Sequence, residues 1–303
     1  MAPVFETKGL TVGYNGVHLF EDLDLQLNAG ELTCFMGPNG CGKSTLIRTL
    51  AGLQPPLHGE IPPKNEKHVA IVLTDRIQSQ HMTVRELVAY GRYPYLGWDL
   101  SLSKDDHEKI GSAISLVRIE NLLDKKINEL SDGQMQMAMI ARALAQDTPV
   151  LLLDEPTAHL DLNNRLEIMN LLRRLARQKN KSILLATHEL DLALQTADTV
   201  WIASGKKLKC GIPEDLVLDG SFDEVFQFKG YDLKTGKVQH EAYRNQSVRL
   251  IGSGPMFLWT KNALERNGFR VDDGGSTEIT VNEIDWQIGK RSFSNLKTLI
   301  DAL

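Results

Sequence analysis

Two groups of residues in this sequence have the types and spacing needed for phosphate chemistry. The first is a GxxxxGK[ST] run, Gly37-Pro38-Asn39-Gly40-Cys41-Gly42-Lys43-Ser44-Thr45. In such a loop glycines turn backbone N–H groups toward phosphate oxygens, the lysine reaches the terminal phosphates, and the next hydroxyl ligates Mg²⁺. Apolar strand and helix patterns flank the run at 31–36 and 46–50, so the loop would open a helix whose dipole favours anions. An ordinary glycine turn with a surface lysine would not need this context. We predict a site for ATP or GTP with Mg²⁺.

The second group follows two apolar strand patterns. The pattern 150–153 ends in Asp154 and Glu155, and the pattern 182–187 ends in His188. Because adjacent side chains on a strand point in opposite directions, the two carboxylates would have different roles: Asp154 in the Mg²⁺ shell and Glu155 beside the attacking water. Phosphoryl transfer depends mainly on positioning and charge stabilisation. A paired Asp-Glu alone is more often a solvated strand end, and a lone histidine is often merely structural. Their place after a phosphate loop favours catalytic roles.

Two further segments complete an ordered set of motifs. Leu130-Ser131-Asp132-Gly133-Gln134 begins a helix pattern, and Tyr14 lies upstream of the phosphate loop. In this order the motifs resemble those of the nucleotide-binding subunit of ATP-binding-cassette (ABC) transporters, over about residues 4–228. The resemblance implies an α/β P-loop ABC ATPase cassette with a parallel-sheet core, an antiparallel β subdomain and a helical subdomain. It also implies that the chain hydrolyses ATP with Mg²⁺.

The resemblance also implies roles for residues outside the phosphate loop. His188 matches the switch histidine that contacts the γ-phosphate, with Lys43 and Glu155 as its catalytic partners. Ser131, Gly133 and Gln134 match the signature loop, which in relatives contacts the γ-phosphate held by a second subunit. Two composite ATP sites therefore imply a homodimer of cassettes. Asp161 would communicate across the interface between them.

Tyr14 would stack on the adenine ring, because an aromatic face offers contact with a base. The alternative is a tyrosine that only packs a turn beside Gly13.

Two positions depart from the family pattern. The signature's usual first glycine is Asp132 here, which adds a carboxylate near an anion site. The segment 70–76 has Thr74 and Asp75 where relatives present a glutamine that touches Mg²⁺. Asp75 is a predicted metal ligand because carboxylate oxygens suit Mg²⁺, but it cannot donate a hydrogen bond as an amide does. These departures motivate one alternative function, a regulatory ATP-binding module.

The patterns along the chain indicate two domains. We assign 1–228 to the nucleotide-binding domain, with a helical subdomain at about 76–148 that contains helix patterns 83–90, 104–117 and 132–145. Residues 229–303 would form a small C-terminal α/β accessory domain, with a strand at 248–251, a helix from Pro255 to Gly268 and strand alternation over Ile284, Trp286 and Ile288. Its loop Gly252-Ser253-Gly254 lacks a lysine, so we do not expect a second phosphate site. Dimer support, partner docking and regulation remain open as its role.

Composition limits the function classes. The 303 residues have a net charge of −5, which gives no electrostatic support for nucleic-acid binding. Three cysteines, one inside the phosphate loop, suggest a reducing compartment. We find no signal peptide and no apolar stretch of about 18 residues, the length that would span a bilayer. Any membrane role would therefore depend on a partner.

The run 83–95 resembles the iron-siderophore, haem and cobalamin importer branch of the family. We therefore predict the ATPase subunit of an importer for such a metal chelate, peripheral at the cytoplasmic face of the membrane. Its partners would be a second cassette, integral permease subunits and an extracytoplasmic substrate-binding protein. The other alternative is a non-transport ABC ATPase. The spacing between Thr45 and Leu130 leaves no room for the long coiled coil of chromosome-type relatives.

Overall fold

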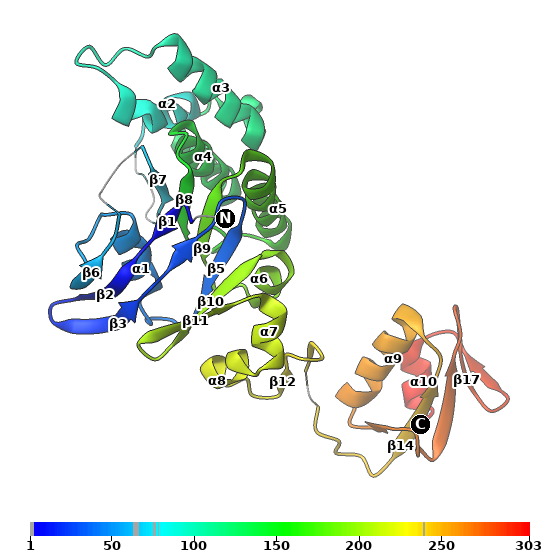
Figure 1. Ribbon diagram of the computed structural model, residues 1–303. Helices are drawn as coiled ribbons and strands as arrows, with labels where there is room; N and C mark the ends of the chain where they lie inside the picture. Colours follow the sequence, from blue (N-terminus) through cyan, green and yellow to red (C-terminus); the bar gives the residue numbers. More distant parts are fainter. Residues whose placement is uncertain (1–2, 63–66, 75–76, 78, 239) are drawn as a thin grey trace. The chain divides into compact units, whose positions relative to one another are not determined.

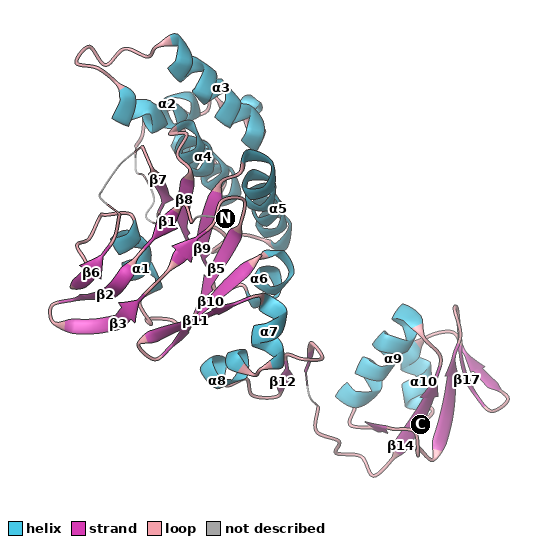
Figure 2. Cartoon of the chain, viewed as in Figure 1, coloured by secondary structure: helices cyan, strands magenta, loops and turns pink. Residues whose placement is uncertain are grey.

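The structure is a computed structural model of residues 1–303, and it describes all of them except 1–2, 63–66, 75–76, 78 and 239, with the side chain of 237 also left out. The chain divides into two compact units, Met1–Gln227 and Phe228–Leu303. Figures 1 and 2 show the order and type of the elements in each. Within the described residues, no helix has the length and apolar character needed to cross a membrane.

A six-stranded sheet in the order β11-β10-β5-β9-β8-β7 forms the centre of the first unit. All neighbours are parallel except β11, which returns from β10 as an antiparallel hairpin. The strands are β5 (Leu32–Met36), β7 (Val69–Val72), β8 (Val150–Asp154), β9 (Ser182–Ala186), β10 (Thr199–Ser204) and β11 (Lys207–Gly211). Strands β5, β8 and β9 are buried along their whole length, as expected for a parallel sheet covered on both faces.

Helices and a second group of strands cover the two faces of this sheet (Figure 1). On one face α1 lies between the parallel sheet and the antiparallel strands, and on the other α5 and α6 pack on β5 and β9. The antiparallel strands are β1 (Phe5–Glu6) with β4 (Gln26–Leu27), and β2 (Lys8–Tyr14) between β3 (Val17–Leu23) and β6 (His58–Glu60). The helices are α1 (Lys43–Leu50), α5 (Leu162–Lys179), α6 (Leu190–Thr196), α7 (Pro213–Leu218) and α8 (Ser221–Phe226).

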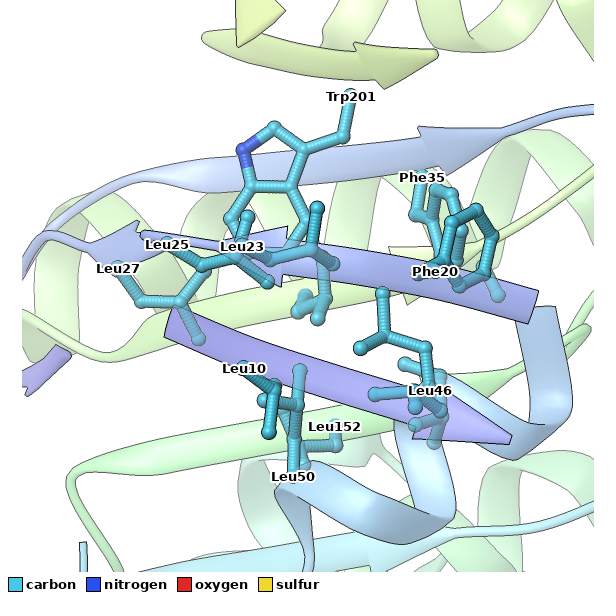
Figure 3. Packing of buried hydrophobic residues seen from close by; sticks show 14 of the residues in the cluster. Leu10, Phe20, Leu23, Leu25, Leu27, Phe35, Leu46, Leu50, Leu152 and Trp201 are labelled. Carbon is cyan, nitrogen blue, oxygen red and sulfur yellow. The ribbon is translucent and has the colours of Figure 1, made fainter. Parts of the chain in front are cut away.

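The core between these layers is apolar and contains side chains from each of them. Figure 3 shows Phe20 of β3 beside Phe35 of β5, and their rings meet edge to face at 5.9 Å between centroids. Leu46 and Leu50 of α1 complete the cluster with Leu10 of β2. This packing fixes the helix that follows the phosphate loop, because its buried side is held by both sheets.

The segment between β7 and β8 is mainly helical. Its elements are α2 (Val84–Ala89), η1 (Tyr90–Tyr95), α3 (Lys104–Val117), η2 (Glu120–Leu122), η3 (Ile127–Glu129) and α4 (Asp132–Ala145). Capping boxes begin α2, α3 and α4, with Thr83, Ser103 and Ser131 as the N-caps. The buried guanidinium of Arg92 donates to Asp106 at 2.7 Å and to the Ala145 carbonyl at 3.0 Å, which ties η1 to α3 and α4.

The second unit is a five-stranded sheet with two helices. The sheet order is β15-β14-β16-β17-β18, and a hairpin of β12 and β13 precedes it. The elements are β12 (Tyr231–Asp232), β13 (Lys237–Val238), β14 (Ser247–Ile251), α9 (Gly254–Arg266), β15 (Arg270–Val271), β16 (Thr277–Val281), β17 (Trp286–Ile288), β18 (Arg291–Phe293) and α10 (Leu296–Asp301). Val248, Leu264, Ile279 and Leu299 lie in its core.

One predicted element of this unit is shorter than the alternation suggested. Ile284 lies outside β17 and is 85% exposed. The Asn282 backbone N–H donates to the Asp285 carbonyl, and the Asn282 side chain donates to the Asp285 carboxylate at 2.6 Å. These bonds close a tight turn between β16 and β17, so Ile284 lies at its tip, and the strand begins only at Trp286.

Candidate nucleotide-binding site

The phosphate loop joins β5 to α1 and depends on glycine at particular positions. Gly40 and Gly42 have φ values of 79° and 107°, in the left-handed region that other residues avoid. Gly42 is the N-cap of α1, and a Cβ placed there would lie 2.9 Å from Leu19 Cδ1. The loop therefore turns tightly over β3 and presents the start of α1, as a phosphate cradle requires.

Lys43 is folded over its own loop. Its side chain is 6% exposed, and Nζ donates to the carbonyl oxygens of Gly37 at 3.0 Å and Pro38 at 3.4 Å. Nζ also lies 3.9 Å from Glu155 Oε1. The amine is thus held at the mouth of the loop, where the terminal phosphates of a nucleotide would arrive.

Asp154, the last residue of β8, is nearly inaccessible, with 2% exposure. Burial raises the pKa of its carboxyl, and a hydrogen bond with Ser44 partly offsets that rise. Its Oδ1 is the one carboxylate oxygen among the described, buried side-chain atoms that has no hydrogen-bond partner. A cation beside this oxygen would relieve its burial as an unpaired acceptor.

The donor set at this point fits Mg²⁺. A carboxylate and a hydroxyl, from Asp154 and Ser44, are oxygen ligands of the kind that Mg²⁺ takes, and the remaining positions of the ion suit phosphate oxygens and water. The described residues contain no cluster of three or more His, Cys, Asp or Glu side chains that could hold a metal ion alone.

Glu155 turns away from β8 in a strained backbone conformation. Its φ is +49°, which costs a non-glycine residue on the order of 1–3 kcal/mol. A hydrogen bond of 2.9 Å from its backbone N–H to the Ala186 carbonyl of β9 helps to hold it there. Its Oε2 lies 3.6 Å from His188 Nδ1, so the structure brings Lys43, Glu155 and His188 together.

This meeting follows from the sheet register. Asp154 pairs with Ala186, and Phe35 pairs with the same Ala186 on the other side of β9. Strands β5, β9 and β8 are therefore adjacent, parallel and level at their carboxyl ends, the edge at which open α/β sheets bind ligands.

The signature residues begin α4. Ser131 Oγ accepts from the Gln134 backbone N–H at 3.3 Å, and Gln134 Oε1 accepts from the Ser131 N–H at 3.2 Å. A Cβ at Gly133 would lie 3.0 Å from Asn164 Cγ of α5, so glycine permits the close approach of these helices. Within one chain, Ser131 and Gln134 thus form a helix cap. Asp132 lines a cavity of about 70 Å³ together with Glu155 and others.

Asp161 caps a helix, whereas Tyr14 lies at the exposed end of a strand. Asp161 is the N-cap of α5, and its Oδ1 accepts from the Asn164 backbone N–H at 2.8 Å. Tyr14 ends β2 with its side chain 52% exposed. Gly13 before it admits no side chain, because a Cβ would lie 1.9 Å from the Val17 carbonyl oxygen. The hairpin therefore presents the Tyr14 ring to the exterior.

The predicted metal ligand Asp75 lies outside the described residues. Its neighbour Thr74 is described, and the Thr74 hydroxyl donates to the backbone carbonyl of Asp154 at 3.0 Å. Thr74, two residues after the end of β7, is thus anchored to the end of β8.

Known proteins are similar to both units of this chain. Residues 20–158 match the family described as ABC transporter, and residues 245–303 match one described as iron ABC transporter C-terminal domain. An uncharacterised ABC transporter ATP-binding protein of Methanocaldococcus jannaschii, MJ0873, is 39% identical over 83% of this chain and 92% of its own length. The chain belongs to the ABC transporter ATP-binding family. It is an ABC-type ATPase, and the predicted cassette fold is confirmed.

Two further relatives of this ABC ATPase concern metal chelates. The ferric enterobactin transport ATP-binding protein FepC of Escherichia coli is 34% identical over 72% of this chain and 84% of its own length. An inward-facing ABC transporter structure, described as of the metal-chelate type, is similar with a TM-score of 0.69 and 26% identity, and the match covers 75% of this chain and 90% of the other.

The sequence did not single out Arg165 and Glu189, which connect two motifs of this ABC ATPase. Arg165 NH1 donates to Glu189 Oε2 at 2.7 Å, and Glu189 Oε1 lies 3.5 Å from His188 Nε2. Both residues adjoin motifs, since Arg165 follows Asp161 by one helical turn and Glu189 follows His188. Their pairing spans 24 residues, and no local pattern indicates it.

Proposed function

We propose that this ABC ATPase hydrolyses Mg-ATP between two copies of the chain and thereby drives uptake of an iron chelate through a separate membrane permease. The observation that carries the catalytic part is the meeting of Lys43, Glu155 and His188 at the carboxyl edge of the parallel sheet. The cargo class is supported by the match of 245–303 to an iron ABC transporter C-terminal domain and by the similarity to FepC. We assign 1–228 to the nucleotide-binding domain, with its helical subdomain at about 76–148, and 229–303 to the accessory domain.

Each group has a place in the chemistry. The loop amides and Lys43 hold the phosphates, and Tyr14 stacks on the adenine. Ser44 and Asp154 hold Mg²⁺, which when bound neutralises charge on the phosphate oxygens. Asp75 is a further proposed ligand of the ion.

Glu155 polarises the attacking water. Its strained backbone aims the carboxylate toward the mouth of the loop, within 3.9 Å of Lys43 Nζ. His188, on the adjacent strand end, then orients the γ-phosphate and the water between them. Because Glu155 and His188 already lie 3.6 Å apart, this pair needs little rearrangement for the chemical step.

The second copy completes each site. Ser131, Gly133 and Gln134 of one cassette would face the γ-phosphate held by the other, with the backbone amides at the start of α4 directed to the anion. Asp161, at the start of α5, would lie at the same interface. The dimer would sit at the cytoplasmic face of the membrane on two permease subunits, supplied by an extracytoplasmic substrate-binding protein, without a role for nucleic acid.

Purification from native membranes tests the transport proposal. The tagged chain would be recovered in mild detergent and its partners identified with their stoichiometry. The complex would then be reconstituted in vesicles for uptake of radioactive iron as a chelate, with Lys43→Ala as the matched inactive complex. We expect an equimolar permease and ATP-dependent uptake that this variant abolishes. A soluble complex without a permease would instead support a non-transport ABC ATPase, and ATP binding without phosphate release would support a regulatory module.

A further inference from the structure

We propose that Arg165 is a positioning residue for ATP hydrolysis, which connects the loop after Glu155 to the switch histidine. The inference rests on the roles proposed above for Glu155 and His188. Arg165 lies outside the sequence motifs. We expect it to affect the chemical step and not the binding of ATP.

The backbone of Arg165 is held in place by the first turn of α5. It lies in the first turn of α5, and its backbone N–H donates to the Asp161 carbonyl at 3.0 Å. From there its guanidinium donates in two directions: Nε to the Leu160 carbonyl at 2.7 Å and NH1 to Glu189 Oε2 at 2.7 Å. Leu160 belongs to the loop 156–161, which runs from Glu155 to α5. A planar guanidinium can hold two such partners at once, which a lysine ammonium on a flexible chain does less well.

Glu189 continues the connection to His188. Its Oε2 accepts from Arg165, while its Oε1 lies 3.5 Å from His188 Nε2. The other ring nitrogen, Nδ1, is 3.6 Å from Glu155 Oε2. The imidazole therefore stands between two carboxylates, and each of its nitrogens faces one of them.

Charge gives Arg165 a second effect on the site. Without a cation beside it, the Glu189 carboxylate would be an unbalanced anion next to the histidine that must approach a phosphate. Its side chain is only 16% exposed, so water screens that charge incompletely. The guanidinium balances it and fixes which oxygen faces the ring.

A purely structural arginine contact would look different, as Arg173 on the same helix shows. Arg173 NH1 makes one exposed hydrogen bond of 3.3 Å, to the Gln195 carbonyl, and this bond touches no motif. An exposed hydrogen bond of that kind contributes little to stability, because water competes for both groups. Arg173→Ala is therefore a matched control for Arg165→Ala, because both remove an arginine from α5.

The test measures ATP hydrolysis, ATP affinity and thermal unfolding of the full-length chain. In Arg165→Ala we expect kcat to fall about tenfold or more while the Kd for a fluorescent ATP analogue stays within about twofold, since misplaced groups slow the chemical step without weakening ground-state binding. Arg165→Lys should recover part of the lost kcat, because it keeps the charge but not the fork. Arg173→Ala should match the wild type in both quantities.

A double variant separates positioning from general damage to the helix. The double variant Arg165→Ala/Glu189→Gln should have a kcat no lower than that of Arg165→Ala, because Glu189→Gln removes the unbalanced charge. The losses of kcat in the two single variants should therefore not multiply. Multiplicative losses, an unchanged kcat in Arg165→Ala, or an equal loss in Arg173→Ala would each overturn the positioning role. Absence of turnover in the wild type would instead overturn the proposed function, so the two failures are distinct.

Discussion

In each unit of the protein a parallel strand leads through a glycine loop into a helix: β5 into α1 in the first unit, and β14 into α9 in the second. The glycines of the two loops have different structural roles. Gly42 has a φ of 107° and caps α1, which exposes the helix start. Gly252 has a φ of 146°, and a Cβ there would lie 2.7 Å from the Val281 carbonyl oxygen of the neighbouring strand. Close packing against β16 is sufficient to explain the second glycine.

The surroundings of the two loops differ more than the loops themselves. In the first unit, Lys43 begins the helix, and the adjacent strand ends bring Glu155 and His188 to it. In the second, Pro255 takes the first turn of α9, which removes one N–H donor, and Ser253 makes no side-chain cap. A glycine loop before a helix therefore does not define a phosphate site by itself. The candidate site of the first unit is distinguished by Lys43 and by Glu155 and His188 at the neighbouring strand ends.

The largest expected effect comes from removing the cation of the first loop. Lys43→Ala should abolish detectable ATP hydrolysis and weaken ATP binding strongly, because this buried amine is held where the terminal phosphates would lie. Phosphate release and equilibrium binding of a fluorescent ATP analogue measure both. Lys261→Ala in α9 is the matched control and should leave both unchanged, because the one ion pair of Lys261 among the described residues is with Glu265 at 3.7 Å. Retained affinity in Lys43→Ala would contradict the phosphate-loop assignment.

Removing the carboxylate at the neighbouring strand end should separate binding from chemistry. Glu155→Gln should lower kcat by about 10²–10⁴-fold, the usual contribution of a general base, while ATP still binds. The variant should then accumulate as an ATP-bound dimer, which size-exclusion chromatography with and without ATP would detect. Unimpaired turnover in this variant would remove the role proposed for Glu155.

The glycines themselves provide a more moderate test of the comparison. Gly42→Ala combines a strained φ with a contact to Leu19, so we expect ATP affinity to fall about tenfold or more, since such strain costs on the order of 1–3 kcal/mol. Gly254→Ala in the second loop has a φ of 80° and no heavy atom within 4 Å, so it should cost only about 1 kcal/mol of stability. ATP binding and thermal unfolding of both variants check this. An equal loss of ATP affinity in Gly254→Ala would contradict the assignment of nucleotide binding to the first loop.

The same comparison shows how far the sequence predicts the fold. The helices 104–117 and 132–145 have the predicted bounds because Ser103 and Ser131 are strong N-caps directly before apolar patterns. The prediction of a strand at Ile284 was wrong, because an alternation of three apolar residues gives no sign of the turn that Asn282 closes. Local patterns specify elements well, but they do not specify turns closed by side chains.

The candidate site shows the same limit. The position of each motif at a strand end follows from apolar runs and turn residues, so the sequence indicates that Glu155 and His188 share an edge of the sheet. The bond between Arg165 and Glu189 depends on where a long side chain points after two loops have folded. Sequence spacing contains no information on that direction, and the roles assigned to the motif residues remain predictions.

The smallest expected effect on turnover comes from a carboxylate in helix α3 of the first unit. Hydrogen bonds from Ser103 and Arg92 lower the pKa of Asp106 from 3.8 to about 2. The folded state therefore favours the ionised form, and the resulting stability is complete above the ordinary pKa and disappears as pH falls toward about 2. Asp106→Asn should reduce the free energy of unfolding at neutral pH without changing ATP turnover there. The difference from the wild type should shrink as the pH falls below 3.8.

Urea unfolding at a series of pH values, followed by circular dichroism, measures that difference. Asp285→Asn is the matched variant in the second unit, where hydrogen bonds from Ser292 and Asn282 also lower the pKa of the carboxyl. We expect a smaller loss there, because Asp285 has no guanidinium partner among the described residues and is more accessible than Asp106, which is 5% exposed. A difference between Asp106→Asn and the wild type that is independent of pH would mean that packing, and not the charge of Asp106, stabilises the contact between η1 and α3.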